Sequence, residues 1–193
     1  HRAVSDEHNA SEGEILAART SPPLLELLQT MDKVSENLFA ELILREVGRA
    51  ARHDGTRKNG LAELSDFLTG IGASSADARL EDGSGLSRNS LVTPRLIAQL
   101  LVYMNGSAFR DAWISLLPAG GRDGTLENRL CCFREGHGVR AKTGSLSRAL
   151  ALSGYADSKT HGRLAFSILV DDFSAPAAEV RQWIDRIAMG LTE

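Results

Sequence analysis

Two short motifs in this 193-residue chain contain side chains that could perform acyl-transfer chemistry. Lys142-Thr143-Gly144 combines an ammonium group, a hydroxyl group and a residue without a side chain. Ser35-Glu36-Asn37, far upstream, adds a second hydroxyl and an amide. An ammonium beside a hydroxyl can bind a carboxylate, and a serine hydroxyl can pass a proton to a leaving amine. We therefore take these two motifs as the candidate site.

The Lys-Thr-Gly motif lies at the end of an expected strand over residues 139–143 and precedes an alternating run that predicts the next strand. On such a strand Lys142 and Thr143 could bind a terminal carboxylate. Gly144 would let a substrate approach the backbone, and the N–H of Ser145 could donate to a developing oxyanion. The alternative is an ordinary strand start with a surface lysine, because one tripeptide alone is a weak signal.

Ser35 and Asn37 lie where the apolar pattern predicts a break between two helices. A side chain at such a break can point into a cleft. The hydroxyl of Ser35 could then relay a proton, and the amide of Asn37 could bind a substrate backbone. The alternative is that Ser35 only caps the second helix. The Lys142 motif downstream favours the site interpretation.

The nucleophile that normally completes such a site is missing from this sequence. Serine acyl-transferases with Lys-Thr-Gly and Ser-x-Asn elements carry it on a Ser-x-x-Lys motif. None of the four lysines follows a serine at that spacing. Removing the serine from such a unit costs most of the rate, so we expect this chain alone to be inactive. The lysines are Lys33, Lys58, Lys142 and Lys159.

Other chemical sites find little support in the sequence. The glycine-rich loop 82–87 lacks the lysine of a phosphate-binding loop, so we expect a structural loop that packs near the site. The histidines have no paired serine and aspartate setting. Cys131 and Cys132 are adjacent, which disfavours a bridge between them, and we interpret them as small half-buried side chains. No spacing resembles a zinc site, and we predict neither metal nor cofactor.

Composition bounds the class of protein. Hydrophobic residues make up 42% of the chain and charged residues 24%, which is typical of a globular domain. The net charge of −3 argues against nucleic acid as a partner. No apolar run reaches the roughly 18–20 residues that span a bilayer. We predict a polar N-terminal segment over residues 1–14, followed by part of a domain over 15–193, and we interpret the chain as a fragment or processed product.

The hydrophobic periodicity predicts an α+β layout, in which a helical block precedes an antiparallel meander and a covering helix. Ser21 is the expected N-cap of the first helix, and Gly48 is the expected end of the second. The second helix and the last helix should each bury a wide apolar face. Leu38, Phe39, Leu42, Ile43 and Val47 form the first face, and Val180, Trp183, Ile184 and Ile187 form the other. Expected strands cover 15–18, 139–143, 148–156 and 163–171, and expected helices cover 22–31, 37–48, 61–68, 93–105, 109–117 and 175–191.

Taken together, six segments resemble the C-terminal part of a class C, low-molecular-mass penicillin-binding protein, a D-alanyl-D-alanine carboxypeptidase/endopeptidase. Several motifs in the right order are far more specific than any one of them. The resemblance covers roughly residues 15–191. Its segments are Ser21-Pro22-Pro23-Leu24, Ser35-Glu36-Asn37-Leu38, Asp82-Gly83-Ser84-Gly85-Leu86-Ser87-Arg88, Asp123-Gly124-Thr125-Leu126, Lys142-Thr143-Gly144-Ser145-Leu146 and Leu152-Ser153-Gly154-Tyr155.

The resemblance implies a β-lactamase/penicillin-binding transpeptidase-like fold and a serine acyl-enzyme hydrolase of the bacterial cell wall. It implies peptidoglycan stem peptides as substrates, β-lactams as inhibitors and a periplasmic or extracytoplasmic location. Ser35, Asn37 and Lys142 would be catalytic, while Thr143, Gly144 and Ser145 would bind substrate. The nucleophile would lie in an N-terminal half of the domain, and a sheet edge left without that half could self-associate. The alternative is a non-catalytic module that binds cell-wall peptide or a partner protein.

Overall fold

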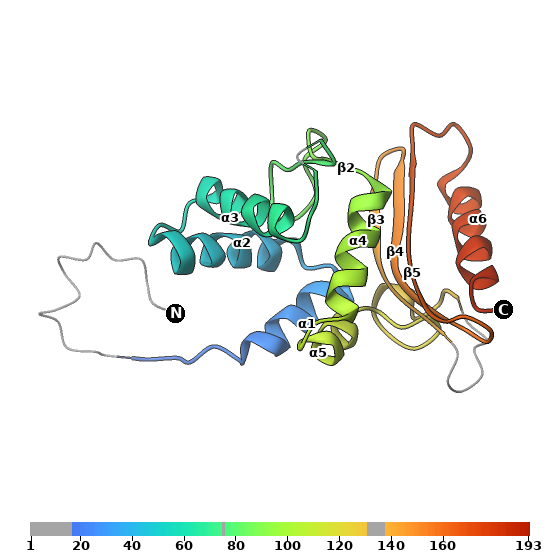
Figure 1. Ribbon diagram of the computed structural model, residues 1–193, viewed down its shortest axis with the longest axis horizontal. Coiled ribbons are helices and arrows are strands. Elements are labelled where there is room, and N and C mark those ends of the chain that lie inside the picture. The colour runs from blue at the N-terminus through green and yellow to red at the C-terminus, as the bar shows by residue number, and fades with distance from the viewer. Residues whose placement is uncertain (1–16, 75, 131–137) are drawn as a thin grey trace, which may run out of the picture.

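A computed structural model describes residues 17–74, 76–130 and 138–193 of the chain (Figure 1). Helices come first, a three-stranded antiparallel sheet follows, and a last helix covers the sheet. The predicted α+β layout is therefore confirmed. The elements are α1 (Leu24–Val34), α2 (Asn37–Arg52), α3 (Arg57–Gly70), β1 (Ala78–Arg79), β2 (Leu91–Val92), α4 (Pro94–Asn105), α5 (Arg110–Leu116), the 3₁₀ turn η1 (Gly124–Leu126), β3 (Val139–Leu146), β4 (Ala149–Ser158), β5 (Gly162–Asp171) and α6 (Ala177–Gly190).

The main sheet has the order β3-β4-β5, with α6 on one face and α4 on the other (Figure 1). Its register pairs Lys142 with Ser153 and Gly144 with Ala151 across β3 and β4. Side chains along a strand alternate between the two faces. Leu150, Leu152 and Ala156 consequently belong to the core beneath α6, while Tyr155 belongs to the core beneath α4 and α5.

Each face of the sheet has its own apolar core. Beneath α6 the core includes Leu126 of η1, which is completely buried. Beneath α4 and α5 it centres on Tyr155, whose hydroxyl donates to Leu101 O at 2.7 Å and accepts from Trp113 Nε1 at 3.1 Å. A buried hydroxyl needs such partners, and these two tie α4 and α5 to the central strand.

α2 and α3 pack closely because two glycines lie where they touch. A Cβ on Gly60 would come within 2.2 Å of Leu44 O, and one on Gly48 within 2.7 Å of the Gly60 nitrogen. The prediction that Gly48 ends the second helix is therefore wrong. The residue is buried inside α2, which continues to Arg52, and its lack of a side chain admits the neighbouring helix.

Two predicted apolar faces are less buried than expected. On α2 the buried residues are Leu44 and Gly48, while Leu38 and Leu42 are 60% and 52% exposed. On α6 the buried stripe is Val180, Ile184 and Ala188, and Trp183 and Ile187 lie beside it, largely exposed. The sequence pattern marks apolar stripes, but neighbouring elements decide how much of each is covered.

Several predicted element boundaries are also corrected. The first helix begins at Leu24 with Pro23 in the N-cap position, not at Ser21. The third begins at Arg57, because Thr56 caps it by accepting from the Asn59 nitrogen. Ala17 and Ala18 belong to no strand, and the rest of the predicted strand 15–18 lies outside the described residues, as do Cys131 and Cys132. The two-residue strands β1 and β2 were not predicted.

Among the helices within the described ranges, none combines the length and the apolar character needed to cross a membrane.

Candidate functional site

The α1–α2 corner holds Ser35 in a left-handed backbone conformation. Its φ is 60° and its ψ is 52°, at the C-cap of α1, and non-glycine residues adopt this region only when surrounding structure compensates. Glu36 then caps α2 by accepting from the Leu38 nitrogen at 3.2 Å. The alternative that Ser35 merely caps α2 is therefore wrong, because its neighbour holds that position and its hydroxyl is directed elsewhere.

The structure brings the Ser35 hydroxyl and the Lys142 ammonium into direct contact. Lys142 Nζ donates to Ser35 Oγ at 2.8 Å and to Thr143 O at 2.9 Å. Lys142 projects from β3 and Ser35 from the helical corner, so the contact joins the two halves of the fold. An ammonium that donates to a hydroxyl oxygen lowers the cost of removing that hydroxyl's proton. The pair can therefore serve in proton transfer.

The Lys142 ammonium lies in a partly desolvated setting. Burial lowers its pKa below the ordinary lysine value of 10.5, and the carboxylate of Asp32 partly opposes this effect. Burial also raises the pKa of Asp32, against the opposing charges of Lys142 and Lys33. Asp32 lies in the last turn of α1, three residues before Ser35. No role for Asp32 follows from the sequence, since a lone carboxylate within a helix carries no local signal.

The outer edge of β3 is open next to Lys142. Upstream, Gly120 N donates to Val139 O, and Ala141 N donates to Pro118 O at 2.9 Å, so odd-numbered residues direct their backbone groups to this edge. Backbone groups alternate sides along an antiparallel strand. The N–H groups of Thr143 and Ser145 therefore point to the same edge, where the described residues place no further strand.

The remaining predicted site residues surround this contact. Asn37 is exposed at the first position of α2, directly after the corner. Gly144 faces Ala151, and a Cβ on it would lie 3.1 Å from the Ala151 Cβ. Glycine at position 144 thus has a packing reason as well as the predicted one of substrate access.

One further residue touches the site but received no role from the sequence. Thr143 Oγ1 donates to Thr125 Oγ1 of η1 at 2.9 Å. Thr125 belongs to Asp123-Gly124-Thr125-Leu126, one of the six segments that carry the family resemblance. That resemblance was the one signal in the sequence that pointed to Thr125. The spacing between Thr125 and Thr143 matches no local period, so their contact is decided by the tertiary fold.

The glycine-rich loop that follows Asp82 is held against α2 by hydrogen bonds. Glu41 of α2 accepts from the Gly83 nitrogen, the Ser84 nitrogen and the Ser84 hydroxyl at 2.9–3.0 Å. Burial works to raise the pKa of Glu41, but these hydrogen bonds outweigh it and the pKa is lowered. Arg88 at the end of the loop donates to Ser147 O at 2.9 Å, next to the end of β3.

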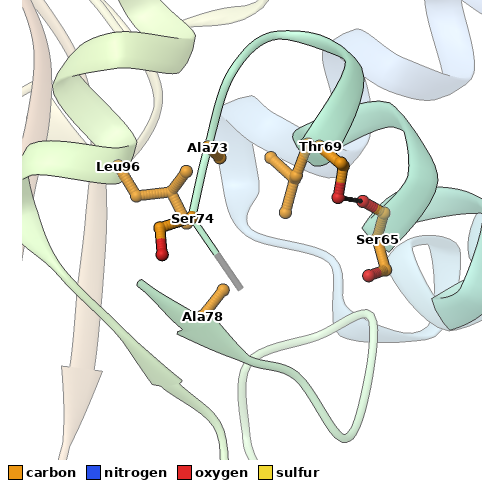
Figure 2. Close-up of a pocket in the computed structure, with 7 residues that line it drawn as sticks. Ser65, Thr69, Ala73, Ser74, Ala78 and Leu96 are labelled. Carbon is orange, nitrogen blue, oxygen red and sulfur yellow. Dashed lines mark hydrogen bonds between the residues drawn. The ribbon is translucent and has the colours of Figure 1, made fainter. Parts of the chain in front are cut away.

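A small cavity lies apart from this site. Its volume is about 170 Å³, and Figure 2 shows it between α3, the segment that follows α3 and the first turn of α4. Neither Ser35 nor Lys142 lines it, so the candidate site is an open edge and not this cavity. The lining residues are Ser65, Leu68, Thr69, Ala73, Ser74, Ala78 and Leu96.

Comparison with known sequences identifies similar proteins along nearly the whole chain. A family model described as the D-Ala-D-Ala carboxypeptidase 3 (S13) family matches residues 2–191. A D-alanyl-D-alanine carboxypeptidase from Actinomadura sp. (strain R39) is 37% identical over 94% of this chain and 34% of its own length. A D-alanyl-D-alanine carboxypeptidase from Haemophilus influenzae is 30% identical over 84% and 35%. The chain thus spans about a third of the length of these curated relatives.

Solved structures give the same result for the fold. Penicillin binding protein 4 from Haemophilus influenzae matches with a TM-score of 0.74 and 25% identity, over 87% of this chain and 39% of its own. That protein has also been solved in complex with a β-lactam. A class A β-lactamase from Bacteroides cellulosilyticus matches with a TM-score of 0.69, over 88% of this chain and 62% of its own, and at 18% identity it supports the fold alone. The predicted β-lactamase/penicillin-binding transpeptidase-like fold is confirmed.

Proposed function

We infer that this chain, which belongs to the D-Ala-D-Ala carboxypeptidase 3 (S13) family, forms the C-terminal part of a serine D-alanyl-D-alanine carboxypeptidase/endopeptidase. The whole protein would act on peptidoglycan stem peptides and would be acylated by β-lactams. The observation that carries the proposal is the 2.8 Å contact between Lys142 Nζ and Ser35 Oγ at the open edge of β3. That contact unites the two motifs from which the sequence predicted acyl transfer.

In this reaction a nucleophilic serine, supplied by the rest of the protein, attacks the carbonyl of the penultimate D-Ala. A bond forms between the oxygen of the nucleophilic serine and the carbonyl carbon, while the bond from that carbon to the leaving amine breaks. The proton that the nucleophilic serine loses passes to the Ser35 oxygen through the lysine of the Ser-x-x-Lys motif, while the Ser35 hydroxyl gives its own proton to the leaving amine. The adjacent Lys142 ammonium stabilises the negative charge that develops on the Ser35 oxygen during this relay. Water then hydrolyses the acyl-enzyme.

The other site residues would hold the substrate during this step. Thr143 and Lys142 would bind its terminal carboxylate, since an ammonium and a hydroxyl both donate to it. The Ser145 N–H, directed to the outer edge of β3, would supply one donor to the oxyanion. The exposed amide of Asn37 would bind the peptide backbone, and Gly144 would let the substrate lie along the strand.

The N-terminal part of the protein would supply the missing Ser-x-x-Lys and would complete the sheet. β5 lies at one edge of the sheet, and within the described ranges no strand pairs with its outer side. A strand of the missing part would bind there. An extracytoplasmic location follows from the proposed cell-wall substrate.

Fluorescent penicillin tests this proposal on the full-length protein. The wild-type protein should form a covalent adduct on a serine upstream of this chain. Lys142→Ala and Ser35→Ala should each slow acylation by about 10²–10⁴-fold, the range typical of a lost proton-transfer group. Lys159→Ala is the matched control, because Lys159 lies in the β4–β5 turn. It should be acylated at the wild-type rate.

The opposing candidate is a non-catalytic module that binds cell-wall peptide or a protein partner through the same edge. Full-length protein that binds a D-Ala-D-Ala peptide but forms no adduct and releases no D-alanine would support that candidate. Equal acylation rates for wild type and Lys142→Ala would contradict the proposed role of the Ser35–Lys142 pair.

A further inference from the structure

The hydroxyl of Thr143 is already engaged in the free protein. Its oxygen donates to Thr125 Oγ1 at 2.9 Å, and the residue is half-buried. A hydroxyl has one proton to donate and two lone pairs to accept with. A bound carboxylate accepts only, so Thr143 must turn its proton away from Thr125 before it can bind the substrate terminus.

Thr125 is itself a hydroxyl and can reverse the direction of this hydrogen bond. When the Thr143 proton turns to a carboxylate, the Thr125 proton can donate to the lone pair left on Thr143. The proton shifts are rotations about C–O bonds, and the Thr125 side chain must also turn slightly, because its oxygen is placed to accept from Thr143. A hydrogen bond of inverted direction, from Thr125 to Thr143, would then keep the Thr143 oxygen anchored while the carboxylate is bound.

We propose that Thr125 is a positioning residue for the carboxylate subsite, which reverses its hydrogen bond with Thr143 when a substrate carboxylate binds. The inference rests on the proposed function and adds a specificity element to it. It predicts that Thr125 favours a negatively charged substrate terminus. A terminal amide presents a donor as well as an acceptor, so the amide gains less from the reversed pair.

The backbone that carries Thr125 is held firmly against α1. Lys33 Nζ donates to both carboxylate oxygens of Asp123 at 2.8 and 2.9 Å and to Leu117 O at 2.7 Å. Asp123 also accepts from the Ala119 nitrogen at 2.9 Å. Burial would raise the pKa of Asp123, but the bonds from Lys33 and Ala119 and the nearby positive charges lower it, so the carboxylate stays ionised at neutral pH.

Gly124 allows this approach to α1. Its φ is +58°, and a Cβ on it would lie 2.4 Å from Lys33 O. Lys33 precedes Ser35 by two residues on the same helix, so one short segment is tied to both motifs of the site. In this segment, residues 123–125, Asp123 binds Lys33 of α1 and Thr125 binds Thr143 of β3. The segment therefore fixes Thr143 relative to the Ser35 corner.

Two variants separate the hydroxyl from the shape of residue 125. Thr125→Val keeps the branched shape and removes the hydroxyl, while Thr125→Ser keeps the hydroxyl. The probes are a peptide ending in D-Ala-D-Ala and the same peptide with a terminal amide, hydrolysed by the full-length protein. Thr125→Val should lower kcat/KM about 3- to 10-fold for the carboxylate peptide, the effect of one lost neutral hydrogen bond. It should leave the amide peptide within about 2-fold, and Thr125→Ser should restore the loss.

A second readout uses the substrate-free full-length protein and does not depend on catalysis. The Thr143 hydroxyl proton exchanges with water more slowly while it is hydrogen-bonded. NMR should show exchange about 5-fold faster in Thr125→Val and unchanged in Thr125→Ser. This result would hold even if the full-length protein formed no acyl-enzyme, which would contradict the proposed function alone.

Two outcomes would overturn the inference. The first is unchanged hydroxyl exchange in Thr125→Val, which would mean that Thr125 does not hold the Thr143 proton. The second is an equal loss of kcat/KM for the carboxylate and amide peptides, which would reduce Thr125 to a general support of the fold.

Discussion

At the scale of single residues, one carboxylate opposes the effect of burial on the charge of Lys142. Asp32 lies one helical turn before Ser35, and its charge interacts with Lys142 and with Lys33. Partial burial lowers the pKa of Lys142, and the negative charge of Asp32 opposes this shift. Asp32 therefore helps keep the lysine protonated in contact with the Ser35 hydroxyl.

Asp32→Asn should lower the pKa of Lys142 further, because the opposing negative charge is removed while burial remains. NMR titration of the Lys142 side chain measures this pKa directly. Asp171→Asn is the control, since Asp171 is exposed at the far end of β5, and it should leave the pKa unchanged. A Lys142 pKa that rises or stays constant in Asp32→Asn would show that the Asp32 charge does not act on Lys142.

The same shift has a defined effect on stability. A folded-state pKa below the unfolded value means that the folded protein binds fewer protons. The penalty from Lys142 is therefore complete below its folded pKa and disappears as the pH rises from there toward 10.5. In Asp32→Asn this gain should begin at a lower pH, which urea unfolding at a series of pH values would detect.

At the scale of elements, the sheet is the frame on which the site depends. β3 carries Lys142 and Thr143, β4 aligns β3 by its register, and α4 and α5 hold β4 from behind through Tyr155. The hydroxyl of Tyr155 is consequently the polar contact that connects these helices with the central strand.

Tyr155→Phe should destabilise the fold by about 1–3 kcal/mol, because it removes the partner of the half-buried Trp113 Nε1 and the buried hydrogen bond to Leu101 O. Tyr103→Phe is a matched control, since Tyr103 is 47% exposed, and it should change the unfolding free energy by less than about 0.5 kcal/mol. Urea denaturation followed by tryptophan fluorescence measures both. Equal effects for the two variants would mean that the Tyr155 hydroxyl contributes nothing specific.

At the scale of the whole molecule, the outer edge of β5 and the margin of α6 are both open to a partner. β5 has no strand on its outer side within the described ranges, and α6 exposes Trp183 and Ile187. An unpaired strand edge presents backbone groups that can pair with another chain. We therefore predict that the isolated 193-residue chain associates through β5.

Sedimentation velocity over a range of concentrations tests this association. The wild-type chain should form larger species as its concentration rises. Trp183→Lys places a charge on the competing apolar surface and should leave the association unchanged. A monodisperse monomer would contradict the prediction, and loss of association in Trp183→Lys would assign it to α6 in place of the strand edge.

The comparison of sequence and structure separates local from long-range information. The three long strands and most helices were predictable, because periods of two and of about 3.6 residues are written along the chain. Helix ends were less predictable where a tertiary contact overrode a local rule. Gly48 reads as a helix end by its residue type, yet it lies within α2 because α3 needs the space that a side chain would fill.

The sequence by itself determined the fold class and the two motifs that meet, because residue type and spacing carry that chemistry. The tertiary structure alone decided what surrounds the motifs. The charge interaction of Asp32 with Lys142 and the hydrogen bonds of Thr125 with Thr143 and of Lys33 with Asp123 join elements that are distant in the chain. No local period encodes such contacts, since they arise only when separate elements pack against one another and partly exclude water.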